Sequence, residues 1–365
     1  MAQAAQIPST MQGVVLTRFG GPECLEYRQD LPVPVPLAGE VLIRVGASAV
    51  NNTDINTRVG WYSKTAQGQT QSAAAVFDSQ QDQDPSWGGV PMAFPRIQGA
   101  DCCGEIVAVG AGVDKKRLGQ RVLVRPIVRA YANYEPYACW YFGSECDGGF
   151  AEFTKVPSDA AVVVQSHLSD AQLASFPCAY STAENLVDRA NVQSGECILV
   201  TGASGGVGSA AVQLAKRRGA KVIAVASIDK HEAVLALGAD RVFDRQVDLE
   251  QTLGRESVDV VIDLVGGVQW PVLLQVLKRG GRYATSGAIA GPLVELDLRT
   301  LYLKDLHLLG CTFQQDHIFD NLVGYIERGE IQPVIGKTYS LKDIAQAQRD
   351  FGEKKFVGKL VFTLP

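Results

Sequence analysis

The sequence predicts an α/β protein with two domains, one β-rich and one built on a doubly wound parallel sheet. Three observations predict it. Short apolar runs broken by turn residues fill the first third of the chain. From about residue 170, apolar strands alternate with helical segments. A glycine-rich turn joins the first strand of this second part to its first helix. The length of 365 residues also fits two domains of roughly 150 residues each.

The N-terminal part predicts a compact β domain. Its strand-like runs have no helical pattern between them, and they lie at 13–16, 40–45, 104–109 and 120–125. The stretch 63–87 differs, because it is rich in Gln, Ala, Ser and Asp and has little apolar periodicity. We therefore expect a long, mobile surface loop there.

The second part has the pattern of a parallel sheet covered on both faces. Strands are expected at 197–201, 221–226, 241–243, 258–263 and 281–285, with helices at 209–218, 230–237 and 270–277. One or two further helices follow Phe313. The chain ends in a strand-like run at 359–362, for which the first domain is a candidate partner.

Composition excludes several classes of protein. The 34 Lys and Arg against 39 Asp and Glu give a net charge of −5 without a dense basic block, which argues against nucleic acid as a partner. The uncharged run Cys197 to Ala215 contains four glycines, so no membrane-spanning segment is expected. The N-terminus lacks a secretory signal pattern, and we expect a cytoplasmic protein. The eight cysteines include no C-x-x-C, so reduced thiols are expected, with Cys102 and Cys103 as buried small residues.

The glycine-rich turn, Val200 to Gly208, is the sharpest local signal. Glycines let the backbone turn tightly and approach a pyrophosphate, and the helix N-terminus offers free N–H groups to the anion. Because the turn follows a strand and opens a helix, we predict a dinucleotide site with contacts from Ser204, Gly205, Gly206 and Val207. The alternative is a turn that only packs the helix.

The end of the second strand indicates which dinucleotide binds. NAD-binding proteins usually carry Asp or Glu there to bond the ribose hydroxyls. This strand ends in Ser227, which leaves room for a 2′-phosphate, and Lys230 lies nearby. NADPH is therefore favoured. The alternative is that Asp229 is the ribose carboxylate and Lys230 only a solvated helix residue.

Several ordered motifs also resemble a known family. They are Gly21-Pro22-Glu23, Val50 to Asn56, Gln98 to Gly104, Asp147 to Glu152, Gly202 to Gly208 and Val357 to Leu360. Over nearly the whole chain the sequence resembles the medium-chain dehydrogenases/reductases, and within them the zinc-independent quinone oxidoreductase and enoyl reductase branch.

The resemblance implies a GroES-like β-rich catalytic domain formed by residues 1–162 and 319–365. A Rossmann NADP(H)-binding domain, residues 163–318, is inserted between these parts. The nicotinamide is expected to reach across a cleft between the domains. A homodimer formed through the Rossmann sheets is also implied.

The resemblance also bears on metal. Zinc enzymes of this family hold the catalytic metal with a Cys, a His and often a second Cys, at positions matching Asn51, Ala100 and Cys178. Asn and Ala cannot replace a thiolate and an imidazole, because zinc needs at least three good protein ligands. Only Cys139 and Cys146 fall in the region of the structural zinc lobe. We therefore predict no zinc.

Without a metal the expected chemistry changes. Hydride addition to the β-carbon of an enone, an enoyl thioester or a quinone produces an enolate, which hydrogen-bond donors and a proton source can stabilise. The segment 54–62 looks like one in mitochondrial 2-enoyl thioester reductases, which implies Tyr62 as general acid. Asn51 would bond the nicotinamide ribose or a substrate oxygen, and Asp54 would orient the segment. The alternative is a loop aromatic beside two residues that only satisfy turn backbone.

Other residues are expected to contact the cofactor. Thr182 is implied to meet the nicotinamide carboxamide. Lys359 is either a ligand of a cofactor phosphate or a solvated lysine at a strand end. Val265 and Ala288, which follow two of the expected strands, are also assigned to the cofactor. Cys178 is expected to line the pocket rather than act as a nucleophile, because no His base is adjacent.

The function predicted from these features is an NADPH-dependent reductase of activated double bonds or quinones on a small-molecule substrate. Two alternatives stay open. One is an alcohol or aldehyde dehydrogenase of the same superfamily. The other is a non-catalytic NADPH-binding module, since fold does not determine function.

Overall fold

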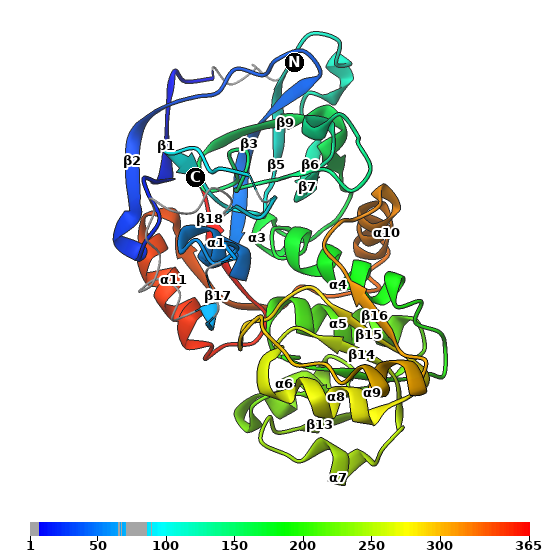
Figure 1. The fold of residues 1–365 in the computed structure, drawn as a ribbon. Helices are drawn as coiled ribbons and strands as arrows, with labels where there is room; N and C mark the ends of the chain where they lie inside the picture. The colour runs from blue at the N-terminus through cyan, green and yellow to red at the C-terminus, as the bar shows by residue number, and fades with distance from the viewer. Residues whose placement is uncertain (1–6, 65, 67, 71–85, 89) are drawn as a thin grey trace.

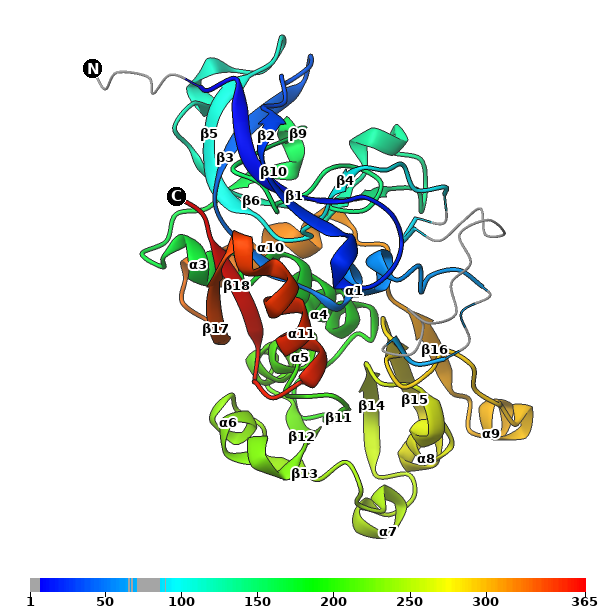
Figure 2. The same ribbon diagram turned by 90° about the vertical axis from the view of Figure 1, so that its left-hand side faces the viewer.

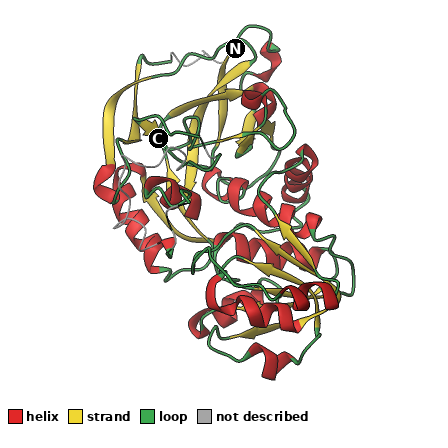
Figure 3. Cartoon of the chain, viewed as in Figure 1, coloured by secondary structure: helices red, strands yellow, loops and turns green. Residues whose placement is uncertain are grey.

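The computed structural model describes residues 7–64, 66, 68–70, 86–88 and 90–365. Most of the loop expected at 63–87 therefore lies outside the described residues. Figure 1 shows a strand-rich domain above a helix-covered sheet, and Figure 3 shows how unevenly helices are divided between them. Among the described residues, no helix is both long enough and apolar enough to cross a bilayer.

The upper domain is organised around one long strand, β3 (Glu40–Val50), which pairs antiparallel with β5, β9 and β18. One sheet has the order β10-β6-β5-β3-β18-β17, a second has the order β2-β1-β4, and β7 pairs with β8. All four strand-like runs expected near the N-terminus are strands. The other strands of this domain are β1 (Thr10–Leu16), β2 (Leu25–Pro32), β4 (Arg96–Ile97), β5 (Cys103–Val109), β6 (Arg121–Val124), β7 (Ile127–Val128), β8 (Trp140–Tyr141), β9 (Phe153–Pro157), β10 (Ala161–Val163), β17 (Ile335–Ser340) and β18 (Lys359–Thr363).

The C-terminal segment returns to the upper domain. Leu360 of β18 pairs with Val50 of β3, and β17 adds to the other side of β18 as a parallel strand. In Figure 2 these C-terminal strands lie side by side next to α11. The sequence indicated the last strand and its partner domain. It did not indicate β17, whose residues are largely exposed and polar.

The lower sheet is wholly parallel and has the order β13-β12-β11-β14-β15-β16. This is the strand order of a Rossmann sheet. The order reverses between β11 and β14, and ligands bind such sheets at the carboxyl ends of the strands beside that point. The strands are β11 (Cys197–Val200), β12 (Lys221–Val225), β13 (Arg241–Phe243), β14 (Val258–Asp263), β15 (Leu277–Thr285) and β16 (His307–Gly310).

The central strands of this sheet are buried on both faces. Ile198 and Val200 of β11 pack into a core shared with α4, α5 and α10, whereas Leu199 packs into a second core with α7 and α8. The period of two along the strand therefore explains the apolar run in the sequence. The α-helices are α1 (Asn52–Arg58), α3 (Asp170–Leu173), α4 (Pro177–Arg189), α5 (Gly206–Arg217), α6 (His231–Ala236), α7 (Leu249–Leu253), α8 (Trp270–Val276), α9 (Leu298–Leu303), α10 (Asp316–Glu327) and α11 (Ile344–Glu353).

Short 3-10 helices complete the described structure. They are Pro22–Cys24, Lys115–Arg117, Ala130–Ala132, Ser158–Ala160, Ile228–Lys230, Gly267–Gln269 and Leu341–Asp343. All eight cysteines are free, and both Cys102 and Cys103 are fully buried.

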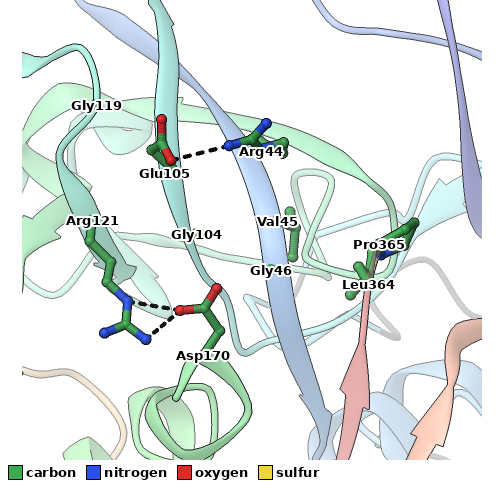
Figure 4. A pocket seen from close by; sticks show the side chains of 10 residues that line it. All are labelled: Arg44, Val45, Gly46, Gly104, Glu105, Gly119, Arg121, Asp170, Leu364 and Pro365. Carbon is green, nitrogen blue, oxygen red and sulfur yellow. Dashed lines mark hydrogen bonds and ion pairs between the residues drawn. The ribbon is translucent and has the colours of Figure 1, made fainter. Parts of the chain in front are cut away.

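A pocket on the upper domain contains none of the sequence-predicted site residues (Figure 4). Its charged side chains pair with one another, Arg44 with Glu105 at 3.1 Å and Arg121 with Asp170. Because these charges are already paired, the pocket offers no free charged group to a ligand. The candidate site lies elsewhere, at the junction of the two domains.

Candidate active site

The two domains meet where β18 passes the glycine-rich turn. The N–H of Gly358 donates to the carbonyl of Ser204 at 2.9 Å. A Cβ on Gly206 would lie 2.8 Å from Cδ of Lys359, so this glycine leaves room for the lysine stem. The C-terminal strand of one domain is thereby placed against the cofactor turn of the other.

The turn itself needs its glycines. Gly202 has φ +59°, a left-handed conformation, and a Cβ on Gly208 would lie only 2.2 Å from the carbonyl oxygen of Gly202. Helix α5 starts at Gly206, three residues before the sequence suggested. The N–H of Gly206 faces Gly358 in an isolated parallel bridge, whereas those of Val207 and Gly208 have no acceptor within the described chain. Two free donors at a helix N-terminus fit a phosphate group.

Three other expected cofactor residues lie at the same edge of the sheet. Ser227, Val265 and Ala288 follow β12, β14 and β15, whose carboxyl ends all meet there. A Cβ on Gly202 would lie 3.3 Å from Cγ2 of Val265, so the turn packs on the segment after β14. The carbonyl of Val265 accepts from the N–H of Ala290 at 2.9 Å, which ties this segment to the one after β15.

Two lysines from different domains come together near the end of α11. Lys230, three residues after Ser227, is 8% exposed, and its amino group donates to the backbone carbonyl of Lys354. Desolvation lowers the pKa of Lys230 and lowers that of Lys354 to about 7, with Lys230 and Lys359 adding to the second shift. Sequence reasoning missed Lys354, because only the tertiary fold brings it beside Lys230. A hydrogen bond from Ser227 lowers the pKa of Asp229, which is exposed.

The most buried charge of the site is Lys359, which is 2% exposed. Its amino group donates to Oδ1 of Asn51 and to Oδ2 of Asp101, the latter at 2.9 Å. Nδ2 of Asn51 donates to the same carboxylate oxygen at 2.7 Å, and the N–H of Cys178 donates to the other at 2.7 Å. The alternative of a solvated lysine at a strand end is therefore wrong. Both polar atoms of the Asn51 carboxamide are hydrogen-bonded within the protein, since Nδ2 also donates to the carbonyl of Ala49.

Asp54 ties the start of α1 to a neighbouring loop. Its fully buried carboxyl group accepts from the N–H of Asn51 at 2.7 Å, of Gly99 at 3.3 Å and of Ala100 at 3.2 Å. Desolvation outweighs these bonds and the charge of Lys359, and raises the pKa of Asp54 to about 7. Asp54 thus joins the start of α1 to the backbone of Gly99 and Ala100, as expected of a residue that orients this segment.

Tyr62 lies beside the same short helix. Its hydroxyl donates to Oγ1 of Thr53 in α1 at 2.9 Å. Its ring lies parallel to that of Trp87, with centroids 6.3 Å apart, and Trp87 stacks on Tyr141 at 4.0 Å. Desolvation raises the pKa of Tyr62 above its usual range, so the phenol stays protonated, as a proton donor must.

Thr182 and Cys178 lie on adjacent turns of α4. The hydroxyl of Thr182 donates to the carbonyl of Cys178 at 2.7 Å. Desolvation, with Asp101 adding to it, raises the pKa of the Cys178 thiol well above its usual range. A thiol held in its protonated form is a poor nucleophile.

The residues present do not fit a catalytic zinc ion. No group of three or more His, Cys, Asp and Glu side chains in the described part of the chain is placed to hold a metal. Asp101 and Cys178 are the two candidates, and both oxygens of Asp101 already accept hydrogen bonds. A divalent cation on Asp101 would also have to lie next to the amino group of Lys359.

Comparison with known proteins identifies the family. Residues 37–166 match the family described as alcohol dehydrogenase GroES-like domain, and residues 206–328 match zinc-binding dehydrogenase. The chain is 30% identical to a quinone oxidoreductase from Lama guanicoe, over 97% of this chain and 98% of the relative. The chain belongs to the medium-chain dehydrogenase/reductase superfamily. Its GroES-like domain, Rossmann sheet and enzyme class are thereby confirmed.

Other members of the superfamily include reductases and dehydrogenases. An acryloyl-coenzyme A reductase from Metallosphaera sedula is 30% identical, over 92% of this chain and 95% of the relative. The structure of a candidate alcohol dehydrogenase from Sinorhizobium meliloti 1021 is 46% identical, with a TM-score of 0.87 and coverage of 98% and 97%. A 2-octenoyl-CoA carboxylase reductase, solved with NADP and 2-octenoyl-CoA, is 25% identical, with a TM-score of 0.82 and coverage of 99% and 89%. As a superfamily member, this chain is a nicotinamide-dependent oxidoreductase that acts on small molecules.

Proposed function

We propose that the protein is an NADPH-dependent reductase that transfers hydride to an activated C=C bond of an enone or enoyl thioester, or to a quinone, without zinc. The observation that carries the proposal is the amino group of Lys359, held by Asn51 and Asp101. Asn51 stands where the family's zinc enzymes have a metal-binding Cys. A site organised around a lysine lacks the Lewis acid that supports alcohol oxidation. Relatives named quinone oxidoreductase and acryloyl-coenzyme A reductase support this reaction class.

Binding of the cofactor is assigned to the edge of the Rossmann sheet. The free N–H groups of Val207 and Gly208 bind the pyrophosphate, which packs against the backbone of Ser204, Gly205 and Gly206. Val265 and Ala288 contact the cofactor along the same edge, and Thr182 receives the nicotinamide carboxamide. When bound, the reduced nicotinamide supplies a hydride.

Tyr62 is proposed to complete the reduction. Hydride addition to the β-carbon breaks the C=C π bond and leaves an enolate, and the Tyr62 hydroxyl gives its proton to the α-carbon. Solvent then returns a proton to the tyrosinate. Asp54 holds Asn51 and α1 in place, and Thr53 orients the Tyr62 hydroxyl until substrate enters.

The preference for NADPH rests on Lys230 and Lys354. Lys230 follows Ser227 by three residues, and the charged groups that act on Lys354 are the cations Lys230 and Lys359. A desolvated cation such as Lys354, on which no carboxylate of the described chain acts, favours a bound phosphate. Asp229 is the competing feature, since its carboxylate is bonded to Ser227 and would suit the ribose hydroxyls of NADH.

Steady-state turnover tests the function. Metal-stripped protein is mixed with NADPH or NADH and with enones, enoyl thioesters, quinones or aldehydes, and loss of the reduced-nicotinamide absorbance is followed. We expect turnover of the first three classes with NADPH. The second candidate, an alcohol dehydrogenase, is favoured by the 46% identical structure and would reduce only aldehydes, with activity restored by zinc.

We also propose a homodimer formed through the Rossmann sheets. Strand β16 is the edge of its sheet, and large apolar side chains around it are exposed. They are Leu293, Val294, Leu298, Tyr302, Leu303 and Leu308. An exposed apolar group of this kind beside an open sheet edge fits a second copy of the chain.

We propose that the catalytic domain consists of residues 1–162 and 319–365, and that the cofactor-binding domain consists of residues 163–318.

A further inference from the structure

Asp263, the last residue of β14, is a fully buried carboxylate that the proposed mechanism does not use. Its Oδ1 accepts from the hydroxyl of Thr201 at 2.5 Å and from the N–H of Val265 at 3.0 Å. Its Oδ2 accepts from the N–H of Gly266 at 3.1 Å and from the hydroxyl of Tyr283. Four donors thus converge on one side chain.

These donors come from three neighbouring strands. Thr201 opens the glycine-rich turn after β11, Val265 and Gly266 form the segment after β14, and Tyr283 lies in β15. The Thr201 hydroxyl also accepts from the N–H of Leu264 at 3.0 Å, which adds a second bond between the turn and the segment. Asp263 therefore sets the spacing between the pyrophosphate turn and the 264–266 segment.

The carboxylate is not needed for a salt bridge. Within the described chain no Lys, Arg or His forms an ion pair with Asp263. Burying an unpaired carboxylate is costly unless hydrogen bonds satisfy it. Here three of the four donors belong to the glycine-rich turn and the 264–266 segment, both at the sheet edge assigned to the cofactor.

We infer that Asp263 is a positioning residue for the cofactor: it holds the glycine-rich turn and the 264–266 segment at the separation that NADPH binding requires. The inference rests on the proposed cofactor site, because Asp263 acts through Thr201 and Val265. It therefore predicts a change in cofactor affinity and no change in the KM of the electrophilic substrate.

The Asp263→Asn substitution tests this. Hydroxyl donors can rotate to suit an amide, but the N–H groups of Val265 and Gly266 cannot. The amide NH2 must face one of them, so the 264–266 segment loses a hydrogen bond and shifts. Tyr283→Phe is the matched control, because it removes one hydroxyl donor and leaves the carboxylate bonded to both backbone groups.

Cofactor affinity is measured by titration with NADPH well below the unfolding temperature, which a thermal melt gives for each variant. Because the 264–266 segment loses a hydrogen bond, Asp263→Asn is expected to raise the Kd about 10-fold. Tyr283→Phe is expected to change it less than about 3-fold. A folded Asp263→Asn protein that binds NADPH as wild type does would overturn the inference.

Two variants at Thr201 test the inference if Asp263→Asn does not fold. Thr201→Val removes the hydroxyl that bonds both Asp263 and Leu264, and Thr201→Ser restores it. Weaker NADPH binding in the valine variant, recovered in the serine variant, supports the inference, and equal affinity in both contradicts it. If the wild-type protein binds neither NADPH nor NADH, the proposed function itself fails, and this inference fails with it.

Discussion

The buried amino group of Lys359 shows how one residue decides the chemistry available to the site. Its positive charge compensates that of Asp101, and it donates a hydrogen bond to the carboxamide oxygen of Asn51. A catalytic metal would need these same groups. We therefore propose that a hydroxyl group, that of Tyr62, supplies the proton.

Tyr62→Phe is the first prediction at this scale. The substitution keeps the ring that lies parallel to Trp87 and removes the hydroxyl that bonds Thr53. Because general acid catalysis typically contributes about 10²–10⁴ in rate, we expect kcat to fall at least about 100-fold with little change in KM. Steady-state kinetics on an enone with NADPH measures this. A kcat within about twofold of wild type would mean that solvent supplies the proton.

Lys354 predicts a pH dependence of NADPH binding. Its pKa is lowered to about 7 in the cofactor-free protein, so most of it is neutral above that pH. A phosphate bound beside it favours the charged form and raises its pKa. Affinity is therefore full below about pH 7 and falls as the pH rises from 7 to the higher pKa of the bound state, with uptake of up to about one proton per NADPH bound.

Calorimetric titration in buffers of different ionisation enthalpy measures that proton uptake. Lys354→Met should remove both the uptake and the pH dependence. Lys355→Met is the matched control, since its side chain is 80% exposed and pairs with Glu353 at 2.8 Å. Equal proton uptake in wild type and in Lys354→Met would show that Lys354 does not take up the proton when NADPH binds.

Residues of the site differ in how readily the sequence predicts them. The glycine-rich turn could be predicted because its chemistry lies in consecutive residues. Lys354 and Asp263 could not, because only the fold brings Lys354 beside Lys230 of the other domain, and Asp263 gains its partners only when three strands align. The bonds of Lys359 to Asn51 and Asp101 were likewise hidden, since they join segments about as far apart as the chain allows.

Among the elements, the turn into α5 shows how closely packed backbone restricts a position to glycine. In Gly208→Ala the new Cβ would lie 2.2 Å from the carbonyl oxygen of Gly202, and backbone cannot move aside cheaply. We expect a loss of about 1–3 kcal/mol in the free energy of unfolding, as for other overpacked sites. Denaturant unfolding measures it.

Gly205→Ala provides the control for that prediction. Its new Cβ would lie 3.5 Å from the same oxygen, an ordinary contact, and its φ is −76°. The free energy of unfolding should therefore stay within about 1 kcal/mol of wild type. If both variants unfold alike, close packing of the turn does not explain its glycines.

Periodicity predicted elements well where burial dictates the pattern. Every strand expected in the parallel sheet is present, because residues buried on both faces must be apolar. Strand β17 escaped notice because most of its side chains are exposed and its place depends on β18. The start of α5 was placed three residues late because glycine is a poor marker of helix.

For the whole molecule, the C-terminal return is what builds a site between domains. Strand β18 completes the sheet of the upper domain and passes the turn of the lower one. The sequence could predict this return from the final strand-like run. It could not predict the face on which two copies of the chain would meet, because exposure is a property of the folded surface.

The proposed dimer gives a prediction at this scale. Leu303→Lys with Leu308→Lys places two charges beside the edge strand β16, and burying them in an interface is costly. We expect a wild-type dimer and a monomeric double variant in sedimentation velocity. Val268→Lys is the control, because Val268 is 95% exposed but lies outside this group of side chains. A monomeric wild-type protein would contradict the proposal.

The reaction class is tested most directly by following the hydride. Metal-stripped enzyme is given NADPH deuterated at nicotinamide C4, on the face that transfers, together with an α,β-unsaturated ketone, and the product is examined by NMR. The account predicts a saturated ketone with deuterium at the β-carbon. An allylic alcohol with deuterium at the former carbonyl carbon, formed only when zinc is added, would contradict it.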